Sequence, residues 1–158
     1  MMQRFILATM IASLAGPALA LSCMRPDAVR LYEQARDSED LYSMVIGTVT
    51  PNAPIVAPTA QGRKTSETPV TLSGRSLTNA GFTGAFDQTV TLRLSCLSVW
   101  CADAPEFEDE VLVTLRHEQD NLVIDVSPCP ANALPANADD EARILNCHRF
   151  EKCDAQQF

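Results

Sequence analysis

The fold is decided by the stretch EVLVTLRHEQDNLVIDV, residues 110–126. Apolar residues occupy every second position on both sides of the polar segment 118–120. A period of two is typical of strands that bury one face, and a short polar segment between two such runs is typical of a turn. The sequence therefore predicts an antiparallel hairpin with strands at 110–117 and 121–127.

More strands are expected upstream of this hairpin. Residues 41–50 (LYSMVIGTVT) are rich in β-branched side chains, which favour strands, and Gly47 within them indicates a bulge or a sharp bend. Residues 70–77 are a further strand candidate, followed by a turn around 79–81. Residues 90–96 alternate between apolar and polar side chains and predict a half-buried strand.

Helices are expected at both ends of the domain. The first begins at Pro26, and apolar residues recur at a spacing of three to four over 28–35. The C-terminal helix spans 138–153. Asn137 is a suitable cap, and the acidic residues 139–141 meet the positive end of the helix dipole.

Between the first two strand candidates lies a long segment, 51–68, which contains three prolines. Loops of this length in a compact domain are either mobile connections or binding loops. The interpretation as a flexible connection is favoured.

Residues 1–20 have the three parts of a cleavable secretory signal. Arg4 precedes an uncharged apolar run, 5–15, and small residues flank a cleavage site after Ala20. Cleavage after Ser22 fits nearly as well. The apolar run is too short to span a bilayer, and no later segment is long enough. We therefore expect residues 21–158 to form a single exported domain, periplasmic or secreted, without an integral membrane span.

The charge of the mature chain excludes some partners. Removing the signal, whose only charged residue is Arg4, takes the net charge from −8 to −9. Such a surface repels phosphate backbones and anionic lipid. Nucleic acid is therefore excluded as a partner.

All cysteines lie after the signal: Cys23, Cys96, Cys101, Cys129, Cys147 and Cys153. An even number in an exported chain of this size indicates three disulfides, although 15 pairings are compatible with six cysteines. Zinc sites use closer cysteine pairs or sets of cysteine and histidine, and the chain has only two histidines. No metal and no cofactor is expected.

The sequence contains no pattern typical of an enzyme. Residues 74–78 (GRSLT) lack the second glycine of a nucleophile elbow. The spacing of Cys96 and Cys101 is wrong for a thiol oxidoreductase. His117 is interpreted as a solvated histidine at a strand end, and His148 as a surface residue of the last helix.

An acidic run could suggest calcium, but it lacks the D-x-D-x-D-G spacing of a tight oxygen cage. The run consists of Glu106, Glu108, Asp109 and Glu110. A solvated approach to the hairpin is the preferred interpretation.

Trp100 is the residue singled out for function. It lies between two cysteines, and it is either a plug of the core or an exposed contact for a partner. The core position is favoured. Phe82 and Phe86, on either side of Gly84, are interpreted as packing between strands.

Several segments carry a family resemblance. They are 22–26 (SCMRP) followed by 40–49 (DLYSMVIGTV), 96–101 followed by 110–115, and 122–129 (LVIDVSPC). They resemble the N-terminal cysteine segment with its first strand, the cysteine turn, and the fifth strand of the superfamily of tissue inhibitors of metalloproteinases and netrin modules. This resemblance implies a mainly β fold: a five-stranded OB-like barrel with an N-terminal and a C-terminal helix.

The resemblance also implies a set of disulfides. The pairs would be Cys23–Cys129, Cys96–Cys101 and Cys147–Cys153. The first would tie the N-terminal segment across the end of the barrel and contribute the most stability, about 4.8 kcal/mol by chain entropy, against about 2 kcal/mol for Cys96–Cys101.

Family members inhibit metalloproteases through an N-terminal cysteine whose amino group and carbonyl chelate zinc. Cleavage after Ala20 would leave Leu21 and Ser22 ahead of Cys23, and only cleavage after Ser22 would free its amine. Leu21 also stands where the family's first cysteine would be. The expected function is therefore a non-catalytic binding module whose loops 51–68 and 97–108 face an envelope or extracellular protein. A protease inhibitor and a small extracytoplasmic hydrolase are the alternatives.

Overall fold

The computed structural model describes residues 23–129 and 132–155, so the expected signal, 1–20, lies outside the described residues. The described chain is mainly β, with two helices. Its elements in order are α1 (Ala28–Arg36), β1 (Tyr42–Pro51), β2 (Thr65–Thr78), β3 (Gly81–Leu97), β4 (Trp100–Cys101), β5 (Val111–Glu118), β6 (Asn121–Val126), β7 (Ala133–Pro135) and α2 (Ala138–Phe150). Neither helix is long and apolar enough to cross a membrane.

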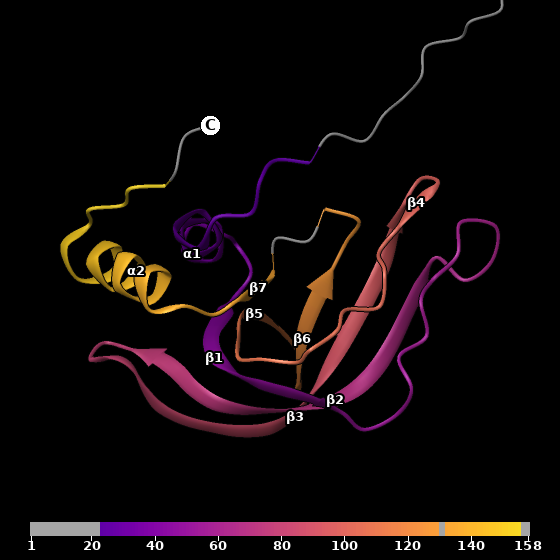
Figure 1. Cartoon of the computed structure of the whole chain (residues 1–158), viewed down its shortest axis with the longest axis horizontal. Helices are drawn as coiled ribbons and strands as arrows, with labels where there is room; N and C mark the ends of the chain where they lie inside the picture. The colour runs from indigo at the N-terminus through magenta and orange to yellow at the C-terminus, as the bar shows by residue number, and fades with distance from the viewer. Residues whose placement is uncertain (1–22, 130–131, 156–158) are drawn as a thin grey trace, which may run out of the picture.

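Five strands close into a ring (Figure 1). Their order is β1-β2-β3-β6-β5, and β5 pairs again with β1. All neighbours in the ring are antiparallel except β3 and β6, which run parallel. The short strands β4 and β7 pair with β3 and β5. The mainly β class with two terminal helices is confirmed.

The predicted hairpin is present as β5 and β6, but the two strands pair only at its turn. The pairs run from Arg116 with Val123 to Glu118 with Asn121. Beyond them β6 turns away to pair with β3, while β5 pairs with β1 and β7. Asn132 bridges the resulting gap, since its side chain donates to Asp125 O at 2.8 Å and its carbonyl accepts from Thr114 N at 3.1 Å.

The strands β2 and β3 are longer than expected, and this corrects the boundaries of the predicted loop 51–68. β2 begins at Thr65, inside that segment, and β3 begins at Gly81 rather than near residue 90. The sequence signal is weak there because many side chains of 81–89 are small or polar and face solvent. The loop itself is attached to the ring, since Ser66 Oγ donates to Val56 O at 2.6 Å. Its flexibility stays a prediction.

Gly47 marks a close approach of two backbones. It is paired directly with Gly74 on β2, without a register shift at that point. A Cβ atom on Gly47 would collide with the carbonyl oxygen of Ser73, and one on Gly74 with that of Ile46. Of the two expectations for Gly47, the bulge is wrong, because its pairing with Gly74 shows no register shift; glycine at both positions lets the two backbones come close.

Two hydrophobic clusters share the strands of the ring. Val45 and Val49 of β1 point into the ring, where they join buried side chains from all five strands. Met44 and Ile46 point outward and pack beneath α1 and α2. A strand buried on both faces has no alternation of polar and apolar residues, and this explains the continuous apolar run in residues 44–46.

Both helix starts are close to their predicted positions. Asp27 caps α1 by accepting from Arg30 N at 3.0 Å, and Asn137 caps α2 by accepting from Asp140 N at 2.8 Å. The predicted end at residue 153 is too late, since α2 stops at Phe150. Glu151 adopts a left-handed conformation (φ 56°), which turns the chain back on itself.

The three disulfides have the pairing that the resemblance implies. Cys23–Cys129 joins residues 106 apart and ties the segment before α1 to the end of β6. Cys147–Cys153 closes the end of α2, and Cys96–Cys101 closes the hairpin between β3 and β4. No free cysteine remains in the described ranges.

Candidate functional site

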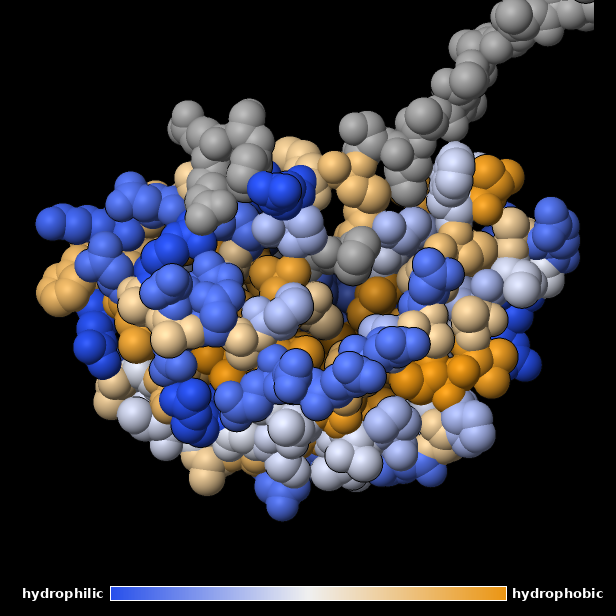
Figure 2. Space-filling view, viewed as in Figure 1, coloured by the Kyte–Doolittle hydropathy of each residue, from blue (hydrophilic) through white to orange (hydrophobic). Residues whose placement is uncertain are grey.

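The hairpin between β3 and β4 presents apolar side chains to solvent. We call residues Leu97–Trp100 the hairpin tip. The exposed fractions are 58% for Leu97, 69% for Val99 and 46% for Trp100. The hairpin projects from the right-hand end of the molecule, opposite the helices (Figure 1), and Figure 2 shows hydrophobic side chains at its end. Across the described parts of the chain, three of seven exposed large apolar residues lie in this tip.

The conformation of the hairpin tip is set by its disulfide and its turn. Cys96 and Cys101 are directly opposite each other in the two strands, and their Cα atoms are 3.8 Å apart. Leu97 pairs with Trp100, so only two residues form the turn. Ser98 there has a φ of 59°, in the left-handed region that tight turns require.

The base of the hairpin is held firmly to the ring. Cys96 N donates to Lys64 O at 2.9 Å, and Ala102 N donates to Ser95 O at 3.0 Å. Ala102 is 3% exposed and belongs to the cluster inside the ring. Aromatic side chains that are held rigidly dominate the binding energy of many protein interfaces, and Trp100 on this anchored hairpin has that arrangement.

The favoured core position of Trp100 is therefore wrong. Ala102, not Trp100, enters the ring interior, where Phe107 and Ile55 also pack against the cluster. With these side chains in place, the tryptophan stays outside. Leu97 and Val99 belong to the loop 97–108 that was expected to face a partner, but no sequence pattern singled them out, although a four-residue segment between paired cysteines is too short to bury its own side chains.

Phe82 and Phe86 are both packed, but only Phe86 packs among the strands of the ring as predicted. Phe82 is 4% exposed and packs beneath the helices, and Phe86 is half-buried against the cluster inside the ring. Both lie on β3.

His117 is exposed at the end of β5, as predicted, but it has a partner that the sequence did not indicate. Its Nε2 lies 2.8 Å from Ser43 Oγ. No carboxylate forms a hydrogen bond with His117 in the part of the chain that the structure describes. The pair therefore lacks the third group that orients the base in a serine hydrolase.

The interpretation of His148 as a plain surface residue is wrong, since its side chain is half-buried. Its Nδ1 lies 3.0 Å from the Tyr32 hydroxyl, and the two rings are in edge contact. Burial raises the pKa of Tyr32. Both residues line an open cleft of about 260 Å³ between the helices, β1 and the turn from β2 to β3.

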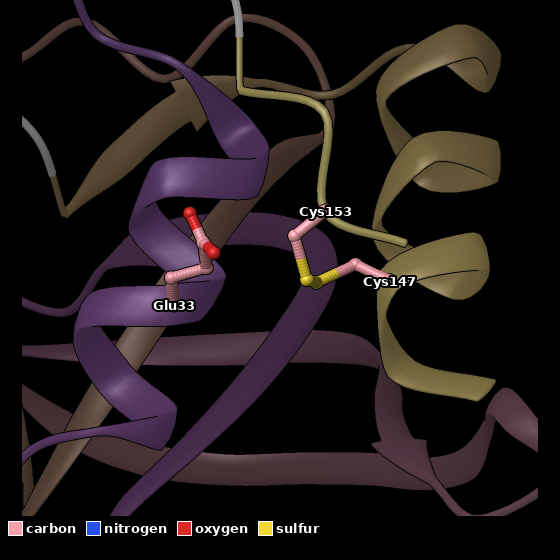
Figure 3. Close-up of side chains that lie close together, drawn as sticks. All are labelled: Glu33, Cys147 and Cys153. Atoms are coloured by element: carbon pink, nitrogen blue, oxygen red, sulfur yellow. A yellow bond between two sulfur atoms is a disulfide. The ribbon is translucent and has the colours of Figure 1, made fainter. Parts of the chain in front are cut away.

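One group of side chains has the spacing of metal ligands. Among the described residues, only Glu33, Cys147 and Cys153 bring three potential ligand atoms within 4.8 Å of one another (Figure 3). The two sulfur atoms are bonded to each other and offer no thiolate. Metal binding by cysteine requires the thiolate, so the oxidised group is a disulfide beside a carboxylate.

The predicted acidic run follows the hairpin and borders a shallow depression of about 240 Å³. Its members do not gather their oxygens within 4.8 Å of one another. The geometry is that of an exposed acidic surface and not of an oxygen cage.

Comparison of the chain with protein-family models, with curated proteins and with solved structures finds no match in any of the three.

Proposed function

We propose that this protein is an exported, non-catalytic interaction module that binds a protein partner through the hairpin tip. The observation that carries the proposal is the exposure of Leu97, Val99 and Trp100 within one disulfide-closed turn. Apolar side chains scattered singly over a surface need no explanation, but a cluster on a projecting, rigid hairpin is typical of a binding site.

The energetics favour binding at this position. Burying the exposed parts of the three side chains contributes on the order of 4 kcal/mol. The disulfide and the anchored base already hold the tip in one conformation, so little conformational entropy is lost on association. The side chains of the tip include no titratable group, which supports a binding role over a catalytic one.

The scaffold in this proposal is an OB-like barrel. Support comes from the closed five-stranded ring, from the helices before its first and after its last strand, and from the three disulfide pairs. The disulfides also fit an oxidising compartment outside the cytoplasm, as the expected signal at 1–20 requires. The partner is then an envelope or extracellular protein.

The test places a photo-crosslinking amino acid, p-benzoylphenylalanine, at Val99 in the full chain expressed in its own cells. The expected result is one dominant crosslinked protein, lost when Trp100→Ala is added. The matched control carries the same probe at Leu41, which is 67% exposed and lies outside the tip. Equal products from both positions, or none from Val99, would overturn the proposal.

The inhibitor alternative has one observation in its favour, the Cys23–Cys129 disulfide at the position that the resemblance implies. Inhibition requires Cys23 to be the first residue of the mature chain. N-terminal sequencing of the exported protein decides this, since Leu21 as the first residue would rule out zinc chelation by the Cys23 amine.

A further inference from the structure

An acidic segment follows the hairpin tip directly. We call Asp103, Glu106, Glu108 and Asp109 the acidic strip. All four side chains are exposed. The segment is fixed at its start by the buried Ala102, in its middle by Phe107, which packs on the cluster inside the ring, and at its end by a hydrogen bond of 2.9 Å from Ala136 N to Glu110 O. The carboxylates are therefore held outward.

The charges of the acidic strip are not neutralised within the described part of the molecule, where none of the four has an ion-pair partner within 4.0 Å. An acidic residue on the strands of the ring does have ion-pair partners. Glu118 is paired with both Arg93 and Arg116, and these contacts lower its pKa to about 2. Like charges next to one another repel, so four unpaired carboxylates in seven residues are a cost that a cationic partner would remove.

The hairpin tip and the acidic strip belong to one continuous surface. The segment after β4 crosses the front of the molecule towards β5 (Figure 1), and Figure 2 shows a row of hydrophilic side chains along this path. A partner seated on the tip would therefore lie next to the strip. A partner surface complementary to both would combine an apolar pocket for the hairpin tip with cationic side chains opposite the acidic strip.

We propose that the partner is a basic protein, which inserts the hairpin tip into an apolar pocket and places lysine or arginine side chains against the acidic strip. This inference rests on the proposed function and adds the chemistry of the partner. A second copy of the chain fits poorly, because its net charge is also negative (−8 for the full sequence, −9 without residues 1–20) and it presents the same acidic surface. Anionic lipid is repelled for the same reason.

The test uses the chain with p-benzoylphenylalanine at Val99 and measures the rate of crosslinking at low and at physiological salt. In the strip variant, Asp103→Asn, Glu106→Gln, Glu108→Gln and Asp109→Asn are combined. The matched control removes the same number of charges elsewhere, with Glu39→Gln, Asp40→Asn, Asp120→Asn and Glu151→Gln, all at exposed positions. Circular dichroism verifies that both variants fold.

The expected result is a partner with an excess of Lys and Arg around the crosslinked site. Its rate of crosslinking falls about tenfold in the strip variant and steeply with salt, and changes little in the control. Equal crosslinking rates in the strip variant and the control, with a rate that still depends on Trp100, would overturn the proposal that the partner is basic and leave the proposed function intact. A crosslink to a second copy would overturn the proposal of a basic partner alone, whereas a crosslink to lipid, or the absence of any product, would overturn both proposals.

Discussion

The molecule contains two short disulfide loops, one of which is packed into a hydrophobic cluster while the other exposes its apolar side chains to solvent. Cys147–Cys153 and Cys96–Cys101 have sequence separations of 6 and 5, so each restricts the unfolded chain to a similar extent, by about 2 kcal/mol. Cys147 is 1% exposed and packs among the residues beneath the helices. The other loop holds Val99 and Trp100 in solvent. Two disulfides of similar loop length thus have different roles: Cys147–Cys153 stabilises packing, and Cys96–Cys101 holds apolar side chains at the surface.

The difference comes from what surrounds each loop. At the helix end, Ile144 and Cys147 of α2 face buried residues of α1, and the contact is closed by an ion pair of 2.7 Å between Asp27 and Arg143. At the hairpin end, β3 is the only strand that pairs with β4 in the described chain. We therefore expect changes at the helix end to reduce stability and changes at the hairpin tip to reduce binding.

The largest loss is expected for Asp27→Ala. The Asp27 side chain is 2% exposed, caps α1 and pairs with Arg143, so its removal leaves a poorly compensated cation and an uncapped helix. Breaking such a pair costs about 4 kcal/mol in the free energy of unfolding. Urea unfolding followed by far-UV circular dichroism measures it, because the fluorescence of the exposed Trp100 reports poorly on the core.

Asp140→Ala is the matched control, since Asp140 also pairs with Arg143 but its side chain is 26% exposed. The expected loss is about 1 kcal/mol or less. Equal losses for Asp27→Ala and Asp140→Ala would mean that the burial of Asp27 does not make its ion pair with Arg143 more important for stability than the exposed pair.

The next largest loss is expected when Cys147 and Cys153 are both replaced by Ala. About 2 kcal/mol comes from the entropy of the unfolded chain, and about 1 kcal/mol from the buried sulfur of Cys147. Crosslinking at the hairpin tip should not change, because the two loops lie at opposite ends of the molecule (Figure 1). A loss of crosslinking without a loss of stability would reverse the roles of the two loops.

The corresponding change at the other loop, Cys96→Ala with Cys101→Ala, is expected to cost at most about 2 kcal/mol. No buried packing is removed, since both cysteines are only half-buried. Crosslinking from position 99 should fall much further than stability, because the tip is no longer held in its binding conformation. A variant that crosslinks as fast as the wild type would show that the disulfide does not preorganise the tip.

The helix end was largely predictable from the sequence, and the hairpin end was not. The cap of α2 and the hairpin β5–β6 follow from local patterns in residues that lie side by side in the chain. The cap of α1 was not predicted, since the sequence places Pro26 in the first helical turn, whereas Asp27 caps a helix that begins at Ala28. The exposure of Trp100 depends on which of several apolar residues fills the ring, and this competition among Ile55, Ala102 and Phe107 is decided by tertiary packing. The contact between Ser43 and His117 likewise joins residues on two paired strands, 74 positions apart.

The extent of β2 and β3 was also beyond the local pattern. Pro69 and several small residues weaken a strand signal, yet Pro69 lies opposite Thr91 in a ladder that keeps its register from Thr65 to Ser76. A carbonyl of proline still accepts a hydrogen bond, and that of Pro69 accepts from Asn52 N at 3.0 Å. The extra residues of each strand pair with the other strand, 65–69 with 91–95 and 81–89 with 71–78, so long-range pairing supplies the stabilisation that the local pattern does not indicate.

The smallest change in stability is expected for Trp100→Ala, and this variant separates the two ends most sharply. Its side chain is 46% exposed and belongs to neither hydrophobic cluster, so the free energy of unfolding should change by less than about 0.5 kcal/mol. Crosslinking from position 99 should fall more than tenfold. Phe82→Ala is the matched aromatic control: Phe82 is 4% exposed and its removal should cost about 3 kcal/mol. If Trp100→Ala instead costs as much as Phe82→Ala, the tryptophan packs into the core in solution. The hairpin tip would then lose its anchor, and the contrast between the two disulfide loops would disappear.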